Sequence, residues 1–185
     1  MNKPNDTIVF ETERLSVRPY TMDDLHHFFR LNGDEDVMRY IRPAQTLEQT
    51  KEFLRKIITA YTQRPGMGRW ALFSKADFRF AGSFAIIPIE NSNQLQLGYA
   101  LIKENWGKGY ATESVKGGLQ YAFDKLGLAE IAGITYPENI PSQKVLLKNG
   151  FVFDRVFIED DKELHVYTRK RLPDNDGCPE RRSNV

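Results

Sequence analysis

Residues 98–111 read GYALIKENWGKGYA, and this stretch decides the fold. Its first half alternates in the manner of a strand, and its last residues open a helix. Between the two, Gly107 and Gly109 flank Lys108. In such a turn successive backbone N–H groups point into one concavity, and the helix adds its positive end, so a phosphate or pyrophosphate fits there. Two glycines equally permit a plain tight connection, so the turn alone does not establish a site.

The two common nucleotide-binding motifs are excluded at this turn. A dinucleotide fingerprint requires a third glycine at position 112, where this chain has Thr112. A P-loop requires Gly-Lys followed by Ser or Thr, whereas Lys108 precedes Gly109. Binding of ATP or NAD is therefore disfavoured, although the turn remains suited to an anion.

The sequence on either side predicts one α+β domain over residues 1–172, with residues 173–185 as a disordered tail. Capping patterns begin helices at Thr21 and Thr46, and apolar spacing predicts two more helices over 111–126 and 141–148. The expected strands are 12–20, 70–75, 80–89, 95–103, 130–136, 151–158 and 164–170. These elements predict a mixed, mostly antiparallel, seven-stranded sheet with flanking helices.

The composition is that of an ordinary globular chain. Of 185 residues, 41% are hydrophobic and 28% are charged, which excludes collagen, coiled-coil and disordered classes. The net charge of +1 gives no field that would attract nucleic acid or an anionic membrane, so neither partner is expected. With one cysteine, Cys178, and no apolar leader in residues 1–7, we expect a cytoplasmic protein without a metal site.

The segment from Trp106 to Ala111 resembles the R/Q-x-x-G-x-G/A acyl-CoA signature of the GNAT N-acetyltransferases. Its flanks are similar to the RimJ and RimL branch, the ribosomal-protein N-terminal acetyltransferases. The matching pieces are Thr12-Glu13-Arg14-Leu15 with Arg18-Pro19, Gly98-Tyr99, Thr112-Glu113, Pro137-Glu138-Asn139 with Ser142, and Asn149-Gly150-Phe151. The resemblance covers residues 12–170 and implies a GNAT-like fold. Two positions depart from the pattern: Trp106 replaces Arg or Gln, and Gln96 stands where many relatives have a glutamate.

The resemblance also implies where acetyl-CoA binds. In the family two parallel strands splay apart and the pantetheine enters between them, which here would be strands 95–103 and 130–136. Backbone groups of the first strand would hold the pantetheine, and N–H groups of the turn would hold the pyrophosphate. The implied cofactor contacts are Tyr99, Leu101, Ile102, Trp106, Gly107, Lys108, Gly109, Tyr110, Ala111, Thr112 and Asn139.

For catalysis the resemblance places Ser142 near the sulfur of acetyl-CoA, where its hydroxyl would donate a proton to the leaving thiolate. The alternative role for Ser142 is to satisfy the backbone at a helix start. Asn139 likewise either contacts the cofactor or caps that helix. Gln96 can orient a water but cannot accept a proton as a general base.

For several other polar and aromatic residues, a structural role is expected rather than a catalytic or binding one. Four residues near the closing hairpin could act as the general base in place of Gln96, and their spacing favours none of them: Glu159, Asp160, Glu163 and His165. Glu113 lies in the first turn of the helix after Gly109, where the helix dipole favours an acid. Tyr40, Trp70 and Phe84 are expected in the core rather than in an acceptor pocket.

The resemblance therefore implies an acetyl-CoA-dependent N-acetyltransferase, with a protein or peptide N-terminal amine as the expected acceptor. A small-amine or antibiotic acetyltransferase is the first alternative. A module that binds acyl-CoA without turnover is the second, because Gln96 replaces the usual acid. The expected assembly is a monomer or a homodimer.

Overall fold

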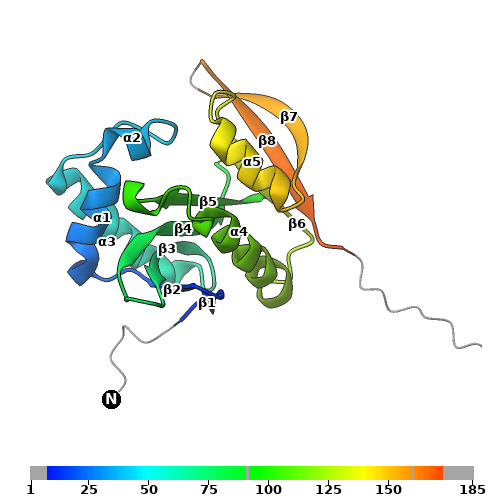
Figure 1. The fold of residues 1–185 in the computed structure, drawn as a ribbon. Helices are drawn as coiled ribbons and strands as arrows, with labels where there is room; N and C mark the ends of the chain where they lie inside the picture. Colours follow the sequence, from blue (N-terminus) through cyan, green and yellow to red (C-terminus); the bar gives the residue numbers. More distant parts are fainter. Residues whose placement is uncertain (1–7, 91, 160, 173–185) are drawn as a thin grey trace, which may run out of the picture.

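The computed structural model describes residues 8–90, 92–159 and 161–172 (Figure 1). The predicted tail, 173–185, and the candidate base Asp160 lie outside the described residues. The strands are β1 (Phe10–Glu11), β2 (Leu15–Pro19), β3 (Gly68–Ser74), β4 (Phe80–Pro88), β5 (Leu95–Leu101), β6 (Glu130–Thr135), β7 (Val152–Glu159) and β8 (Lys162–Lys170). The α-helices are α1 (Leu25–Asn32), α2 (Glu35–Met38), α3 (Leu47–Gln63), α4 (Tyr110–Gln120) and α5 (Ile140–Lys148).

The strands form one sheet in the order β1-β2-β3-β4-β5-β6-β8-β7. Only the β5 and β6 neighbours are parallel; the other described pairs are antiparallel. The α+β class with a mixed sheet is confirmed, but the prediction of seven strands was wrong. The additional strand is β1, whose two residues pair with Val17 and Ser16. Two residues are too few to show an alternating pattern, and Phe10 is held there by ring packing on Phe84.

Capping residues begin the front helices as the sequence predicts. Thr46 accepts a hydrogen bond from the Gln49 N–H, and the Gln49 side chain accepts one from the Thr46 N–H. At the first site, Asp24 accepts from the Thr21 N–H and a short 3₁₀ turn, Met22–Asp24, precedes α1. The helix expected over 111–126 instead changes at Tyr121 into a π-helical turn that ends at Lys125.

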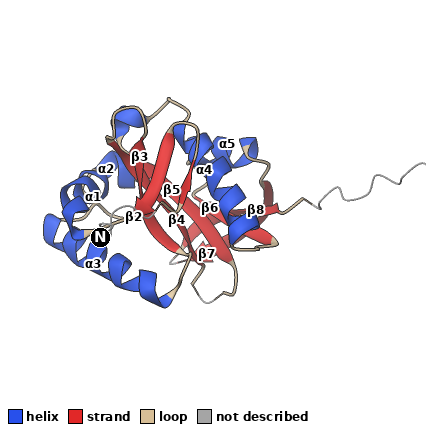
Figure 2. Cartoon of the chain, turned by 90° about the horizontal axis from the view of Figure 1, so that it is seen from below, coloured by secondary structure: helices blue, strands red, loops and turns tan. Residues whose placement is uncertain are grey.

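Helices cover both faces of the sheet (Figure 2). On the first face a hydrophobic cluster joins α4 and α5 to the strands, and it contains Phe84 and Trp70 as expected for core residues. On the second face another cluster packs α1, α2 and α3 against the strands. We call these the α4/α5 face and the α1–α3 face. The expectation that Tyr40 lies in the core was wrong: it is half-buried outside both clusters, and its ring lies 6.2 Å from that of Tyr136.

The helices of the described ranges include none that is both long enough and apolar enough to cross a bilayer.

Candidate active site

The two parallel strands at the centre of the sheet, β5 and β6, are paired over only a short stretch. β5 and β6 pair at two positions, Gln96 with Ala132 and Leu97 with Gly133. Beyond these pairs β5 continues to Leu101 and β6 to Thr135 without pairing to each other. The region between the two unpaired strand ends is called the strand gap below. It lies where the sequence resemblance implies the splayed strands.

The backbone of β5 offers hydrogen-bonding groups to the strand gap. The Ile102 N–H donates to the Ala81 carbonyl of the β4 side, at 3.2 Å. Because N–H groups alternate between the two edges of a strand, the N–H groups of Tyr99 and Leu101 face the other edge, toward the gap. The Leu101 carbonyl accepts a bond of 2.8 Å from the indole N–H of Trp106. Tyr99 and Leu101 therefore fit their predicted cofactor role.

The sequence resemblance implies that Ile102 contacts the cofactor, but its backbone does not face the strand gap. Its N–H is bonded to Ala81, and its carbonyl accepts from the Asn105 N–H at 2.9 Å. Its side chain is buried in the cluster on the α1–α3 face. Trp106 instead contributes its side chain, which fixes the end of β5 next to the turn.

The glycine turn, residues 107–109, follows a short 3₁₀ turn, Lys103–Asn105, after β5 and leads into α4 in a conformation that glycine favours. Gly107 has φ +73° and Gly109 has φ +81°, both in the left-handed region. A methyl-sized group built on Gly107 would meet no atom within 4 Å, so the turn borders open space. Gly109 is the N-cap of α4, and the N–H groups of residues 110–112 are first-turn donors without helical partners. This arrangement suits an anion, and Lys108 beside it donates to Asn105.

Arg14 and Glu113 connect the segment between β1 and β2 to this turn. This contact was not predicted from the sequence. The Arg14 guanidinium donates to the Glu113 carboxylate at 2.6 Å and to the Lys108 carbonyl at 3.0 Å. The Thr12 hydroxyl and the Arg14 N–H also donate to Glu113. Burial opposes the charge of Glu113, but these hydrogen bonds from Thr12 and Arg14 hold its pKa below the usual range. Glu113 therefore does more than complement the helix dipole.

We predict that Glu113→Gln lowers the free energy of unfolding by about 1–3 kcal/mol, because hydrogen bonds to a charged group are lost. Because the pKa of Glu113 is lower in the folded state than in the unfolded state, its carboxylate stabilises the fold at pH values above the unfolded pKa of 4.5. This stabilisation is lost as the pH falls through the folded pKa. Urea unfolding of both proteins at pH 7 and at descending pH below 4.5 measures the difference, which should shrink with acidity.

The matched control for this carboxylate is Glu52→Gln. Glu52 forms an exposed ion pair with Arg55 on α3, so its substitution should cost less than about 1 kcal/mol. Equal losses for the two variants would contradict the fastening role of Glu113.

Ser142 and Tyr99 come together on the α4/α5 face. The Tyr99 hydroxyl on β5 lies 3.2 Å from the Ser142 hydroxyl on α5. Burial raises the pKa of Tyr99 to about 12, and the bond with Ser142 acts in the opposite direction. Both hydroxyls are therefore protonated at neutral pH and can donate. Asn139 caps α5 by accepting from the Ser142 N–H at 3.3 Å, so the capping role foreseen for it is present.

Gln96 is placed apart from this hydroxyl pair. Leu97 and Tyr99 pack in the cluster on the α4/α5 face, and residues alternate along β5, so Gln96 points to the α1–α3 face. His165, one alternative base, lies on β8 with its Nε2 3.2 Å from Glu163, at the closing hairpin. The structure thus joins Tyr99 with Ser142 and leaves Gln96 on the opposite side of the sheet.

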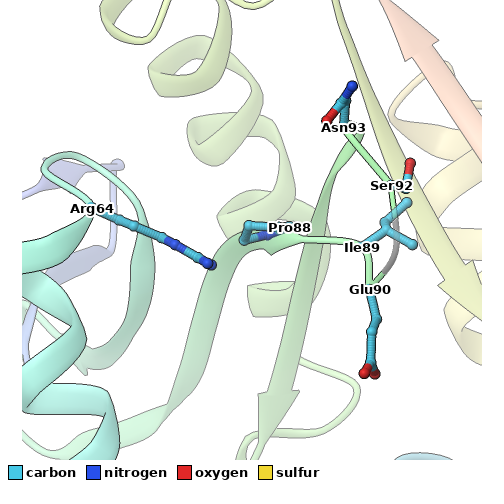
Figure 3. Close-up of a pocket in the computed structure, with 6 residues that line it drawn as sticks. All are labelled: Arg64, Pro88, Ile89, Glu90, Ser92 and Asn93. Atoms are coloured by element: carbon cyan, nitrogen blue, oxygen red, sulfur yellow. The ribbon is translucent and has the colours of Figure 1, made fainter.

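Two hollows on the surface differ in their relation to these groups. The first, of about 620 Å³, lies between the end of α3 and the β4–β5 loop (Figure 3). It is lined by Arg64, Pro88, Ile89, Glu90, Ser92 and Asn93, at the end of β5 away from the strand gap. The second, of about 540 Å³, borders the glycine turn and is lined in part by Ile102, Lys108 and Tyr110. Only the second adjoins predicted site residues.

Comparison with known proteins agrees with this geometry. The family model for the acetyltransferase (GNAT) domain matches residues 14–152. The uncharacterized N-acetyltransferase YoaA of Bacillus subtilis is 27% identical over 77% of this chain and 82% of its own length. A GNAT-family acetyltransferase structure from Bacillus anthracis superposes with a TM-score of 0.77 at 24% identity, covering 87% of this chain and 97% of that one.

A putative ribosomal-protein-serine acetyltransferase from Vibrio cholerae shares the fold, with a TM-score of 0.74 at 18% identity over 91% of this chain and 100% of that one. The family model covers most of the described chain, from the Arg14 contact through the strand gap and the glycine turn to α5. The chain therefore belongs to the GNAT family, and it is an acetyl-CoA-dependent N-acetyltransferase.

Proposed function

We propose that this enzyme acetylates the N-terminal amine of a protein or peptide, with acetyl-CoA bound in the strand gap and against the glycine turn. The observation that supports this site most strongly is the end of the β5–β6 pairing after Leu97, followed by the left-handed turn at Gly107 and Gly109. One segment thus offers a free strand edge for an extended amide chain and a group of N–H donors for phosphates.

The residues present fit the parts of acetyl-CoA. The Tyr99 N–H would bond to the pantetheine as the missing neighbour of β5, and the Leu101 N–H would face the acetyl group. N–H groups from Gly107 to Thr112, with Lys108 nearby, would hold the pyrophosphate, and Asn139 would add a contact from the start of α5. When bound, acetyl-CoA supplies an activated acetyl thioester.

The proposed chemistry of the chain's own groups follows from their positions. The Leu101 N–H would stabilise the negative charge that develops on the acetyl oxygen. The Ser142 hydroxyl would donate its proton to the departing sulfur and recover one from Tyr99 or solvent. Gln96 would orient water on the α1–α3 face, and water would take the proton from the attacking amine.

The choice of a protein or peptide acceptor rests on the branch resemblance of the sequence and on the fold shared with the Vibrio cholerae protein. The competing proposal is a free small amine. Acetylation of N-terminal peptides compared with polyamines, amino acids and aminoglycosides decides between the two.

We predict that saturating acetyl-CoA or CoA raises the melting temperature, whereas ATP and NAD do not. A ligand at 100 times its dissociation constant adds about 2.7 kcal/mol to the stability of the folded state. The measurement is thermal melting with the four ligands in parallel. A shift with ATP or NAD alone would contradict the assignment of the acetyl-CoA site. A shift with acetyl-CoA, without release of CoA when any amine is added, would favour a module that binds acyl-CoA without turnover.

A further inference from the structure

Two arginines on the α1–α3 face have no carboxylate partner within residues 8–90, 92–159 and 161–172. Arg69 lies on β3 and Arg42 follows α2, and their guanidinium carbons lie 6.0 and 4.3 Å from the ring centre of the same residue, Phe53. Arg42 donates to the side-chain oxygen of Asn32 at 2.7 Å, but its Nε is buried without a hydrogen-bond partner. The ion pairs of the described residues include neither guanidinium.

The two charges disfavour each other. Burial lowers the pKa of Arg42 to about 10, and the charge of Arg69 lowers it further in the same direction. Burial also lowers the pKa of Arg69. Both side chains are half-buried and remain cationic at neutral pH, and like charges that are partly removed from water are unfavourable without a counter-charge. An anion that reaches this pair would remove the repulsion and satisfy the free Nε.

This arginine pair lies beside the strand gap. Arg69 pairs across the sheet with Ala85, and Ala85 pairs with Gly98, so the three residues form one row on the α1–α3 face. Gly98 is the first residue of β5 beyond the last pair with β6. A methyl-sized group built on Gly98 would meet no atom within 4 Å, so the row ends in open space at the gap. Two strand spacings put the Arg69 backbone about 10 Å from that space.

The segment that carries Arg42 also crosses toward the gap. Tyr40, two residues earlier, contacts the ring of Tyr136, which directly follows β6. This segment therefore extends from Phe53 on α3 to the end of β6, on the face opposite to the one where Ser142 contacts Tyr99. A molecule that entered the gap from the α1–α3 face would pass the strand row that includes Arg69 and the segment that carries Arg42.

We propose that Arg42 and Arg69 bind a carboxylate of the amine acceptor, so that the enzyme selects acceptors with an acidic group close to the reacting amine. The inference rests on the proposed function and narrows its substrate class. Guanidinium groups recognise carboxylates through paired hydrogen bonds, which gives both affinity and orientation. The carboxylate belongs either to an acidic residue near a peptide N-terminus or to a small amino acid.

The test compares acceptors that differ only in this charge. One pair consists of peptides that begin Ser-Glu and Ser-Gln, and the other of γ-aminobutyrate and its amide. In each productive pair we expect kcat/KM to be roughly 10- to 100-fold higher for the acid, mainly through KM, since a charged hydrogen bond is lost in the amide. The pair with turnover identifies the source of the carboxylate.

The Arg42→Gln/Arg69→Gln double variant should lose this preference while keeping the thermal shift with acetyl-CoA. Arg64→Gln, which removes an equal charge at the exposed end of α3, should keep the preference. Equal kcat/KM for acid and amide in the wild type would overturn the inference and leave the proposed function intact.

A binding measurement that needs no turnover distinguishes failure of the proposed function from failure of the arginine inference. Glutarate should raise the melting temperature of wild type and of Arg64→Gln more than glutaramide does, and the double variant should not distinguish them. If no amine releases CoA, the proposed function fails, and the glutarate comparison still decides whether the arginine pair binds a carboxylate. Absence of a glutarate effect in the wild type would count against the pair.

Discussion

Gly109→Trp should abolish the thermal shift that acetyl-CoA produces and weaken its binding by at least about 100-fold. Gly109 has φ +81°, and an added Cβ would already lie 3.3 Å from the Arg14 guanidinium. An indole there fills the space in front of the first-turn N–H groups, so at least two charge-assisted hydrogen bonds to the phosphates are lost. Calorimetric titration of the purified variant with acetyl-CoA measures the affinity directly.

Gly127→Trp is the matched control, because Gly127 has φ +65° just beyond the other end of the same helical segment. A Cβ built there would meet no atom within 4 Å. Both variants should lose about 1–2 kcal/mol of stability from the left-handed backbone, but only Gly109→Trp should lose ligand binding. If Gly109→Trp bound acetyl-CoA as tightly as Gly127→Trp does, the glycine turn would not be the phosphate site.

Ser142→Ala should lower kcat about 100-fold and leave acetyl-CoA affinity nearly unchanged. A positioned proton donor contributes at least this factor to a rate. The helix cap survives the substitution, because Asn139 accepts from the backbone N–H of residue 142 and not from its side chain. Steady-state kinetics with the best acceptor, together with titration of acetyl-CoA, separates turnover from binding.

Removal of the neighbouring hydroxyls locates the donor more closely. Tyr99→Phe should reduce kcat less than Ser142→Ala, and the double variant should be no worse than Ser142→Ala, since the two groups act as one unit. Tyr167→Phe is the control, because it removes a tyrosine hydroxyl that bonds to Gln143, the next residue of α5. A large loss in Tyr99→Phe with none in Ser142→Ala would make Tyr99 the donor.

Local features of the fold could be predicted from the sequence. The capping box at Thr46 and Gln49 and the glycine turn after β5 depend on residues within a few positions of each other. Such interactions form between chain neighbours, so their residue patterns are visible without the fold. The position of the strand gap was also expected, although through resemblance to a family and not from periodicity.

Contacts between distant residues could not be predicted. Arg14 and Glu113 are 99 positions apart, and Tyr99 and Ser142 are 43 apart, so no local pattern links them. Arg42 and Arg69 lack a nearby carboxylate among the described residues because of how the fold places the acidic side chains. The net charge of +1 gives no sign of this local excess of positive charge. The orientation of Ile102 required the register of β5 on β4, because a shift of one residue exchanges the two edges of a strand.

Because only two described residue pairs join β5 to β6, the backbone hydrogen bonds of the sheet fall into two units. Strands β1–β5 form one continuous antiparallel ladder, and β6–β8 form another. Side chains such as Ile131 and Leu146 continue the core across the junction, but few hydrogen bonds do. Amide hydrogens of such units exchange through separate opening events. A ligand that bonds to the free edge of β5 restores the continuity of the sheet, so the groups that set its affinity also set how rigidly the two units move together.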